Sequence, residues 1–452
     1  MKVLMFGWEF PPHISGGLGT ACFGLTESLR KSKTQILFVI PHAVVETIEE
    51  GPEIISASTI LVPVLSSEIY QELPVQNHSE EATGISNLET IRVHSAIVPY
   101  TSTDVLSDCP SITAWNFQLP ETSIVNMIDS HTGRINSRAV VRYQFSGGYG
   151  PNLLEEVQQY GLVGAEIARQ RNFDIIHVHD WLTFKAGIAA KGISGKPLVV
   201  HVHSTEFDRA GENVDVRIFE IEREGMEAAD QIIAVSQWTK NIITSRYSIS
   251  PDKVKVVHNG ALPQPHNEST ELPHIGKRVV TFLGRITHQK GPAYFIDAAA
   301  MVLQKFHDVH FVMAGSGDLL PEMIERVACL RIASKFHFTG FLKKNRVDQL
   351  WSATSLYVMP SVSEPFGISP LEAVQAGVPV IISNQSGVAE VMQNVVKVDF
   401  WNVEALADAM CNILKYSSLS ETLKIKSLQE ISDLTWDRAA KKINAIYHDL
   451  AE

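Results

Sequence analysis

Residues 356–373, LYVMPSVSEPFGISPLEA, place an apolar run, a polar turn and a helix start directly after one another. The run 356–360 predicts a buried strand, and 369–372 (Ser-Pro-Leu-Glu) matches a capping box with proline in the first helical turn. The alternative is a helix that begins nearer Gly367, with its free N–H groups at the end of the strand. A strand that runs into a helix after a short turn is the repeating unit of α/β proteins.

The same strand-and-helix pattern recurs along the chain in two series. Continuous apolar strands that alternate with amphipathic helices indicate parallel sheets with helices on both faces. The predicted strands are 2–6, 35–41, 174–179, 197–203, 231–236 and 254–258 in the first series, and 278–284, 310–315, 335–341, 356–360, 379–383 and 394–398 in the second.

Between the two series, residues 261–277 (ALPQPHNESTELPHIGK) have the proline-rich, polar composition of a linker. We therefore predict an α/β, GT-B-like arrangement of two Rossmann-like, doubly wound domains that face a central cleft. The first domain would span residues 1–262 and the second 263–433, followed by an amphipathic closing helix in 434–452. Residues 44–135 are less regular, and we expect them to add strands and loops to the first domain.

Composition and charge exclude several classes of function. The chain has 452 residues, is 45% apolar and carries a net charge of −12 with dispersed basic residues, so no nucleic-acid partner is expected. Its four cysteines lie far apart without a CxxC pair, which favours a reducing compartment. A membrane-spanning helix needs about 18 or more apolar residues, and no such run occurs. We expect a cytoplasmic protein without an integral membrane segment.

Three glycines follow the first predicted strand and open a helix: Gly16, Gly17 and Gly19, within HISGGLGTACFG. Glycines let the backbone approach a ligand closely, and a helix N-terminus offers N–H groups to an anion. The spacing is not GxGxxG, so we do not predict dinucleotide binding. The alternative interpretation is a flexible turn between strand and helix.

In the second domain, Arg285 and Lys290 follow the first predicted strand, within FLGRITHQKG. Two cations at a strand end can clamp a diphosphate, although surface loops also carry such pairs. Gly315 and Gly317 end the next strand, where a nucleotide base or ribose can lie against bare backbone.

Two strands of the first domain end in His-x-His, which places His177 with His179 on one face and His201 with His203 likewise. Paired histidines can bind a metal, but four histidines with no clear carboxylate partner fit no common metal pattern, so no metal is expected. We expect the strand-end member, His179 or His203, to reach the cleft, and the inner ones to lie in the core.

Together these residues resemble the retaining nucleotide-sugar glycosyltransferases of the GT-B fold, in particular the bacterial and archaeal glycogen (starch) synthases. The resemblance covers nearly the whole chain and is weakest over 44–135. It rests on the order and strand-end placement of R-x4-K (Arg285, Lys290), E-x7-E (Glu364, Glu372), the N-terminal GGLG and HVHDW.

The resemblance implies a role for each matching residue. Arg285 and Lys290 would neutralise the leaving diphosphate, Glu364 would contact the transferred sugar, and Glu372 would hold the nucleotide ribose. His179 would lie near the sugar. The other residues expected at the site are Gly16, Gly17, Gly19, Gly315, Gly317, Phe366 and Gly367 on the donor side, and His203 and Glu206 near the sugar or acceptor.

The implied activity is that of a hexosyltransferase that moves glucose from ADP-glucose or UDP-glucose to an α-glucan, without a cofactor. The Asp-x-Asp motif of metal-dependent glycosyltransferases occurs nowhere in the chain. Ile14 and Thr20 stand where glycogen synthases often carry lysine and aspartate, which leaves glucan elongation and the donor nucleotide open. The alternatives are a lipid or small-sugar acceptor, and an inactive protein that only binds nucleotide sugars.

Overall fold

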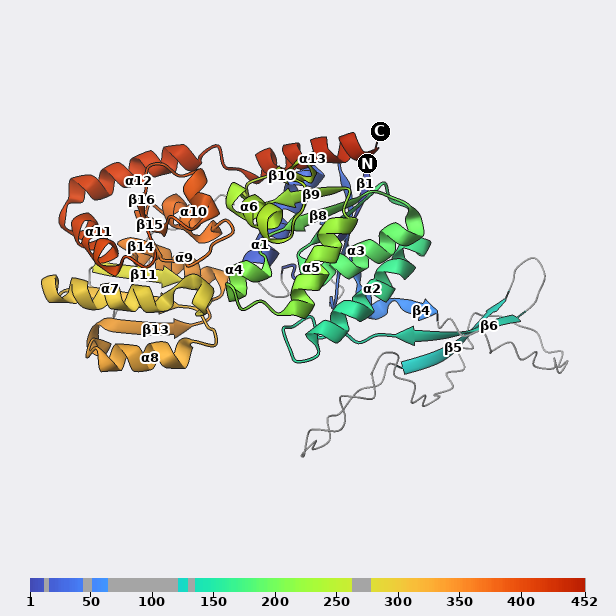
Figure 1. Ribbon diagram of the computed structural model, residues 1–452, viewed down its shortest axis with the longest axis horizontal. Helices are drawn as coiled ribbons and strands as arrows, with labels where there is room; N and C mark the ends of the chain where they lie inside the picture. The colour runs from blue at the N-terminus through green and yellow to red at the C-terminus, as the bar shows by residue number, and fades with distance from the viewer. Residues whose placement is uncertain (12–15, 44–50, 64–120, 129–134, 262–277, 452) are drawn as a thin grey trace, which may run out of the picture.

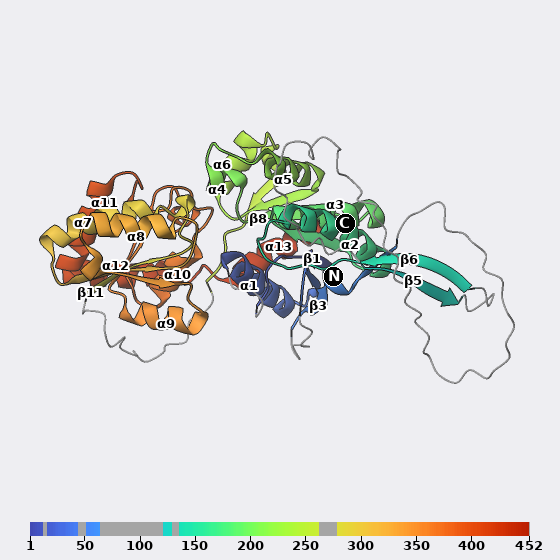
Figure 2. The same cartoon turned by 90° about the horizontal axis from the view of Figure 1, so that it is seen from below.

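The chain folds into two α/β lobes that lie side by side, with a small antiparallel sheet projecting from the first lobe (Figure 1; Figure 2). The computed structural model describes residues 1–11, 16–43, 51–63, 121–128, 135–261 and 278–451. Each lobe contains a parallel sheet covered by helices, which confirms the predicted fold class. Within these described ranges, no helix is both long and apolar enough to cross a membrane.

The first lobe is built on a seven-stranded parallel sheet with the order β10-β9-β8-β7-β1-β2-β3. From β1 the chain first builds outward to β2 and β3, then returns to the other side of β1 with β7, so the direction of winding reverses between β1 and β7. The strands are β1 (Lys2–Phe6), β2 (Gln35–Ile40), β3 (Glu53–Ser56), β7 (Ile175–His179), β8 (Leu198–Val202), β9 (Gln231–Ala234) and β10 (Val254–Val256).

Helices cover both faces of this sheet because its strands are apolar on both faces. Along β1, Leu4 and Phe6 enter a core formed with α2, α3 and α5, whereas Val3 and Met5 enter a second core with α1 and α13. The helices of this lobe are α1 (Gly17–Lys31), α2 (Leu153–Gln170), α3 (Trp181–Ser194), α4 (Glu206–Ala210), α5 (Val216–Ala228), α6 (Gln237–Arg246) and α13 (Trp436–Ala451).

The second lobe holds a six-stranded parallel sheet with the order β13-β12-β11-β14-β15-β16, which reverses between β11 and β14. Its strands are β11 (Arg278–Leu283), β12 (Val309–Ala314), β13 (Phe336–Gly340), β14 (Leu356–Met359), β15 (Val380–Ser383) and β16 (Val396–Val398). One core lies under α7 (Pro292–Lys305), α8 (Leu320–Cys329) and α11 (Val403–Lys415), and the other under α9 (Lys344–Ala353), α10 (Ile368–Gln375) and α12 (Ser417–Ile431).

The described parts of the less regular segment 44–135 contain strands and one short 3-10 helix, Ala57–Thr59. β3 extends the main sheet of the first lobe, and β4 (Leu61–Pro63) and β5 (Glu121–Ile128) pair antiparallel with β6 (Ile135–Arg142). This small sheet points away from the second lobe (Figure 2).

The last helix, α13, returns to the first lobe after α12 of the second lobe (Figure 1). It packs along α1, and Trp436, Ile443 and Tyr447 are buried in the core beneath it. Gly24 permits this contact, since a Cβ there would lie 2.4 Å from the indole nitrogen of Trp436. The chain therefore crosses between the lobes twice, which limits how far the two can separate.

Candidate active site

Several of the predicted site residues lie where the two sheets reverse their winding. In open α/β sheets, ligands bind in the crevice outside the carboxyl ends of strands at such a reversal. In the first lobe, the glycine-rich segment follows β1 and His179 ends β7. In the second lobe, Arg285 follows β11 and Glu364 follows β14. Helix α4 of the first lobe contacts residues 288–290 of the second, so the two sets of strand ends face each other.

Lys290 and Glu364 meet at the edge of the second sheet. The Lys290 ammonium donates to Glu364 Oε2 at 2.5 Å, and Ser361 Oγ donates to the same oxygen at 3.2 Å. The Glu364 backbone is also fixed, because its N–H donates to the Gln385 carbonyl and its C=O accepts from Gly387 N, both at 2.9 Å. Glu364 is only 6% exposed. One cation of R-x4-K and one carboxylate of E-x7-E are therefore already paired in the structure.

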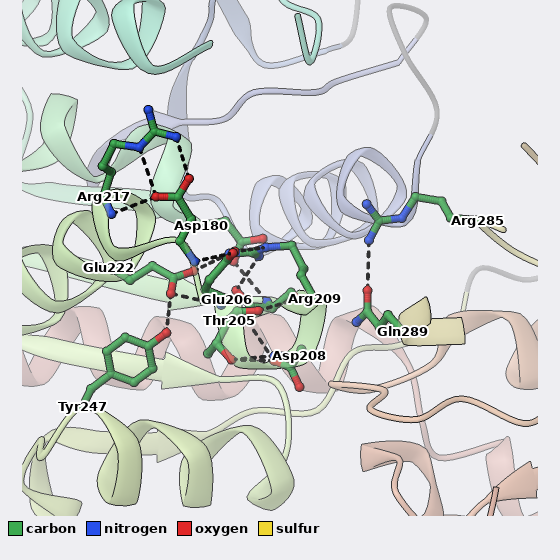
Figure 3. A network of polar contacts seen from close by, with 12 residues as sticks. Asp180, Thr205, Glu206, Asp208, Arg209, Arg217, Glu222, Tyr247, Arg285 and Gln289 are labelled. Atoms are coloured by element: carbon green, nitrogen blue, oxygen red, sulfur yellow. Dashed lines mark hydrogen bonds and ion pairs between the residues drawn. The ribbon is translucent and has the colours of Figure 1, made fainter. Parts of the chain in front are cut away.

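Arg285 is the exposed cation of this region. Its guanidinium donates to Gln289 Oε1 at 3.2 Å (Figure 3). It also lies within electrostatic reach of the Tyr149 phenol from the first lobe. An exposed guanidinium with a neutral partner can bind an oxyanion without first breaking an ion pair. Lys290 and Arg285 thus differ: one is held by a carboxylate, and the other is available to a ligand.

Gly315 and Gly317 are required by the packing of two loops. A Cβ on Gly315, whose φ is +143°, would lie 1.8 Å from the Gly284 carbonyl oxygen. A Cβ on Gly317 would lie 2.2 Å from the Ile286 carbonyl oxygen. The loop after β12 therefore lies directly against the loop that carries Arg285, which gives both glycines a structural role in addition to any contact with a ligand.

Gly367, not Ser369, is the N-cap of α10. The helix begins at Ile368, and Gly367 adopts a φ of +103°. The capping-box interpretation of residues 369–372 is therefore wrong, and the helix begins near Gly367, which was the alternative. A Cβ at Gly367 would lie 3.3 Å from Glu364 Cγ, so glycine lets the Glu364 side chain pack against the helix start.

The other residues of this segment occupy different surroundings. Phe366 is 2% exposed and packs in the core beside α10, so its side chain is not on the surface of the site. Glu372 lies within α10, and removal from water raises its pKa to about 7, an effect that nearby Lys344 partly opposes. A partly protonated carboxyl that keeps some exposed surface can donate to or accept from a ribose hydroxyl.

The glycine-rich segment rests on a carboxylate that sequence reasoning missed. Glu9, 5% exposed, accepts from Gly16 N at 3.1 Å and from the Tyr149 hydroxyl. A Cβ on Gly16 would lie 2.7 Å from Glu9 Oε2, which explains the glycine, whereas Gly17 faces open space and Gly19 is buried in the first turn of α1. Tyr149 leaves 58% of its surface exposed. The glutamate near the end of β1 was the only local signal for this arrangement.

The two departures from the glycogen-synthase pattern lie beside this segment. Thr20 Oγ1 donates to the Gly16 carbonyl at 3.1 Å, so the residue at the aspartate position stabilises the first turn of α1. Ile14 lies outside the described residues.

The four histidines form one cluster of imidazole rings on β7 and β8. His177 Nε2 and His201 Nδ1 are 3.3 Å apart, His179 Nδ1 and His203 Nε2 are 2.9 Å apart, and the Tyr447 hydroxyl contacts His177 Nδ1. Burial lowers the pKa of His177 and of His203 to about 3, so both rings are neutral at pH 7.

Exposure distinguishes the members of this cluster. His203 keeps part of its surface exposed, whereas the rings of His177, His179 and His201 are enclosed. Nitrogens of these three rings lie within 4.8 Å of one another, as a bound metal would require. However, each of the four histidines already uses a ring nitrogen in a hydrogen bond to another ring. Among the described residues, His179 Nε2 has no hydrogen-bond partner, but this atom is enclosed, so of the two strand-end histidines His203 is the one that keeps exposed surface.

Asp180, also missed from the sequence, ties the ends of β7 and β8 together. Its carboxylate accepts from His203 N at 2.6 Å and from Ser204 N at 3.2 Å. The backbone of Asp180 has a φ of 58°, a conformation that a non-glycine residue adopts only under strain. Burial raises the pKa of its carboxyl to about 7, although the Arg209 charge opposes the rise. A strained, partly protonated acid at a sheet reversal is typical of functional sites.

Glu206 belongs to a buried ionic network rather than to the open surface of the site (Figure 3). Arg209 Nε donates to Glu206 Oε2 at 3.0 Å, and Arg209 Nη2 donates to Glu222 Oε1 at 2.5 Å. Tyr247 also donates to Glu222. Each carboxylate therefore has hydrogen-bonded partners, and the network fixes α4 against α5.

Comparisons with known proteins give the family matched by each half of the chain. Residues 137–262 match the family described as Glycosyltransferase Family 4, and residues 264–429 match the family described as Glycosyl transferases group 1. An uncharacterized glycosyltransferase of Methanocaldococcus jannaschii is 26% identical over 99% of this chain and 98% of that relative. The alpha-maltose-1-phosphate synthase of Mycolicibacterium smegmatis is 28% identical over 61% of this chain and 79% of its own length.

Among solved structures, the sucrose-phosphate synthase of Thermosynechococcus elongatus has a TM-score of 0.64 at 16% identity and covers 99% of this chain and 98% of that structure. At this identity the likeness concerns the fold: two facing Rossmann-like domains. The family matches lie on both sides of the linker and agree with the two-domain fold. Residues 264–429 belong to the group 1 glycosyltransferases and residues 137–262 to glycosyltransferase family 4, within a chain that has the GT-B fold.

Proposed function

We propose that this glycosyltransferase is a retaining hexosyltransferase that moves glucose from a nucleoside-diphosphate glucose to an α-glucan. The observation that carries the proposal is the Lys290–Glu364 pair, 2.5 Å between Nζ and Oε2, beside the exposed Arg285 at the reversal of the second sheet. A sugar with a diphosphate leaving group needs cations at the phosphate and an acceptor of hydrogen bonds at the sugar. This edge of the sheet provides both.

The leaving group would be stabilised by charge that is already in place. As the glycosyl–phosphate bond breaks, negative charge grows on the departing phosphate and positive charge grows on the sugar. Lys290 has three N–H donors, of which Glu364 takes one, so the others remain for phosphate oxygens. Arg285 would approach from the exposed side. Because the Lys290 ammonium is held before the donor arrives, little reorganisation is needed when charge develops.

Retention of configuration would follow from attack on the face that the phosphate leaves. The acceptor hydroxyl forms the new C1–O bond as the C1–O(phosphate) bond breaks, and its proton passes to the departing phosphate. Glu364 would hold a sugar hydroxyl, while His203, the member of the histidine cluster with exposed surface, would face the sugar from the first lobe. Closure of the cleft would exclude water, which otherwise hydrolyses the donor.

We further propose that the reaction needs no metal. Mg²⁺ or Mn²⁺ in other glycosyltransferases neutralises the diphosphate, a task for which this chain has Lys290 and Arg285. The chain also lacks the Asp-x-Asp motif.

The acceptor is proposed from a relative whose name indicates its product. Alpha-maltose-1-phosphate synthase, by its name, forms a phosphorylated disaccharide of α-linked glucose. This supports glucose as the transferred unit and an α-linked glucose chain as the product. It also makes a small phosphorylated sugar the second candidate for the acceptor.

A matrix of donors and acceptors tests the proposal. ADP-, UDP- and GDP-glucose would each be incubated with maltooligosaccharides, glycogen, glucose 1-phosphate and a lipid acceptor, and products separated by chromatography. Lengthened maltooligosaccharides are expected. Exclusive transfer to glucose 1-phosphate or to the lipid would reject the glucan acceptor, and release of free glucose alone would reject transfer.

A further inference from the structure

The loop that carries Glu364 is tied to the opposite lobe on both sides of this residue. On one side, Ser363 Oγ donates to Asp208 Oδ1 in α4 at 2.6 Å. On the other side, the Pro365 carbonyl accepts from Ser236 Oγ at 2.5 Å. Glu364 therefore lies between two residues that are held by the first lobe, and a movement that separates the lobes would break the contacts on both sides of it.

Asp208 is a rigid partner for Ser363. It is 2% exposed, and its second oxygen accepts from the backbone N–H and the hydroxyl of Thr205, both at 2.8 Å. These bonds form a capping box that fixes Asp208 at the start of α4. Ser363 is the side-chain donor to Asp208 Oδ1 among the residues that the structure describes. Leaving a buried carboxylate oxygen without its donor is costly, so this bond is strongly favoured when the lobes are together.

Ser363 also receives a bond from a third element. Trp238 Nε1, at the start of α6, donates to Ser363 Oγ at 3.2 Å while the Ser363 hydroxyl donates to Asp208. The serine thus uses its hydroxyl both as donor and as acceptor toward the first lobe. On the second lobe, the adjacent Glu364 carboxylate holds Lys290. A continuous set of contacts runs from α4 to the cation at the leaving group.

We propose that Asp208 is a positioning residue that, through Ser363, places Glu364 against the transferred sugar only when the lobes are closed. This rests on the proposed function, because it assumes that Glu364 contacts that sugar. Closure and correct placement of Glu364 then occur together, so an open cleft cannot hydrolyse the donor. Asp208 itself does not touch the reacting atoms.

The test compares Ser363→Ala, which removes the hydroxyl, with Ser363→Thr, which keeps one. Ser352→Ala is the matched control, because Ser352 bonds only carbonyls of its own helix among the contacts described. A hydrogen bond to a charged group supports a loss of about tenfold to a hundredfold in kcat for S363A. The KM for the donor should change by less than about threefold, since the diphosphate contacts remain. S363T should recover most of the loss, and S352A should match the wild type.

A second readout does not depend on turnover. The ¹H–¹⁵N signal of the Trp238 indole, assigned with Trp238→Phe, reports the bond to Ser363 and should shift in S363A but not in S352A. Wild-type kcat in S363A, or equal losses in S363A and S363T, would overturn the inference while the proposed function stands. A wild-type protein that transfers sugar from none of the donors would reject the proposed function, and this inference with it.

Discussion

Replacement of Arg285 by alanine separates stability from activity, because the two cations of R-x4-K have different surroundings. Arg285 is exposed and donates to a neutral partner, Gln289, at 3.2 Å. Its loss should change the free energy of unfolding by no more than about 0.5 kcal/mol, as for other surface substitutions. Loss of one preorganised charge at the leaving group should lower kcat/KM about 100-fold or more, or about 2.7 kcal/mol in activation free energy.

Replacement of Lys290 by alanine should affect both quantities. The Lys290 side chain is 21% exposed and that of Glu364 is 8% exposed, so the variant leaves a buried carboxylate without its counter-charge. Breaking a buried pair in this way costs about 3–5 kcal/mol, and the residual exposure of Lys290 places the expected cost toward the lower end. A fall of several degrees in Tm should accompany a loss of activity at least as large as that of R285A.

The assays are differential scanning fluorimetry for Tm and steady-state kinetics with the donor identified by the matrix. Arg346→Ala is the matched control for R285A, because Arg346 is also an exposed arginine that donates to a glutamine, Gln349, at 3.1 Å. Lys305→Ala, which breaks an exposed pair with Asp408, is the control for K290A. If kcat/KM of R285A stays within tenfold of the wild type, or its Tm falls as far as that of K290A, the reasoning is refuted.

Three further predictions concern pH, metals and the last helix. Burial raises the pKa of Glu372 from 4.5 to about 7 in the folded protein. Between these two pH values the folded protein binds a proton that the unfolded chain does not, so the free energy of unfolding falls as the pH rises from 4.5 to 7. Glu372→Gln should therefore match the wild type in Tm at pH 4.5 and be more stable by roughly 1–3 kcal/mol at pH 8, whereas an equal difference at both pH values would contradict this. Transfer activity should survive prolonged dialysis against EDTA, and activity that EDTA abolishes and Mn²⁺ restores would make the histidine cluster a metal candidate. Deletion of residues 435–452 should leave an insoluble protein, because it strips Trp436 and Tyr447 from the core of the first lobe, and a soluble variant with native circular dichroism would contradict the packing described.

The fold was predictable because the strands are apolar on both faces and each runs into a helix. The same logic placed Arg285, Lys290 and Glu364 at the strand ends of one sheet. The local sequence could not show where α10 begins, since residues 369–372 match the capping-box pattern. The φ of +103° at Gly367, which sets the actual start, depends on the packing of Glu364.

Contacts between segments that lie far apart in the chain could not be predicted from the sequence patterns. An amphipathic helix shows which of its faces is buried but not which lobe covers it, so the return of α13 to α1 could not be read from the spacing of Trp436 and Tyr447. Tyr149 meets Glu9 across 140 residues, and Ser363 meets Asp208 across 155. Phe366 stands between two predicted ligand residues, yet its side chain lies in the core.

The measurement that tests the central claim most directly is the anomeric configuration of the product. An α-linked nucleoside-diphosphate glucose with ¹³C at C1 would be incubated with a maltooligosaccharide, and the C1–H1 signals of donor and product followed by NMR. We predict a new α-glucosidic C1 signal that grows as the donor signal falls, with little free glucose. A β-linked product would contradict retention, and conversion of the donor to free glucose or to an epimer, without a glycoside, would contradict glycosyl transfer.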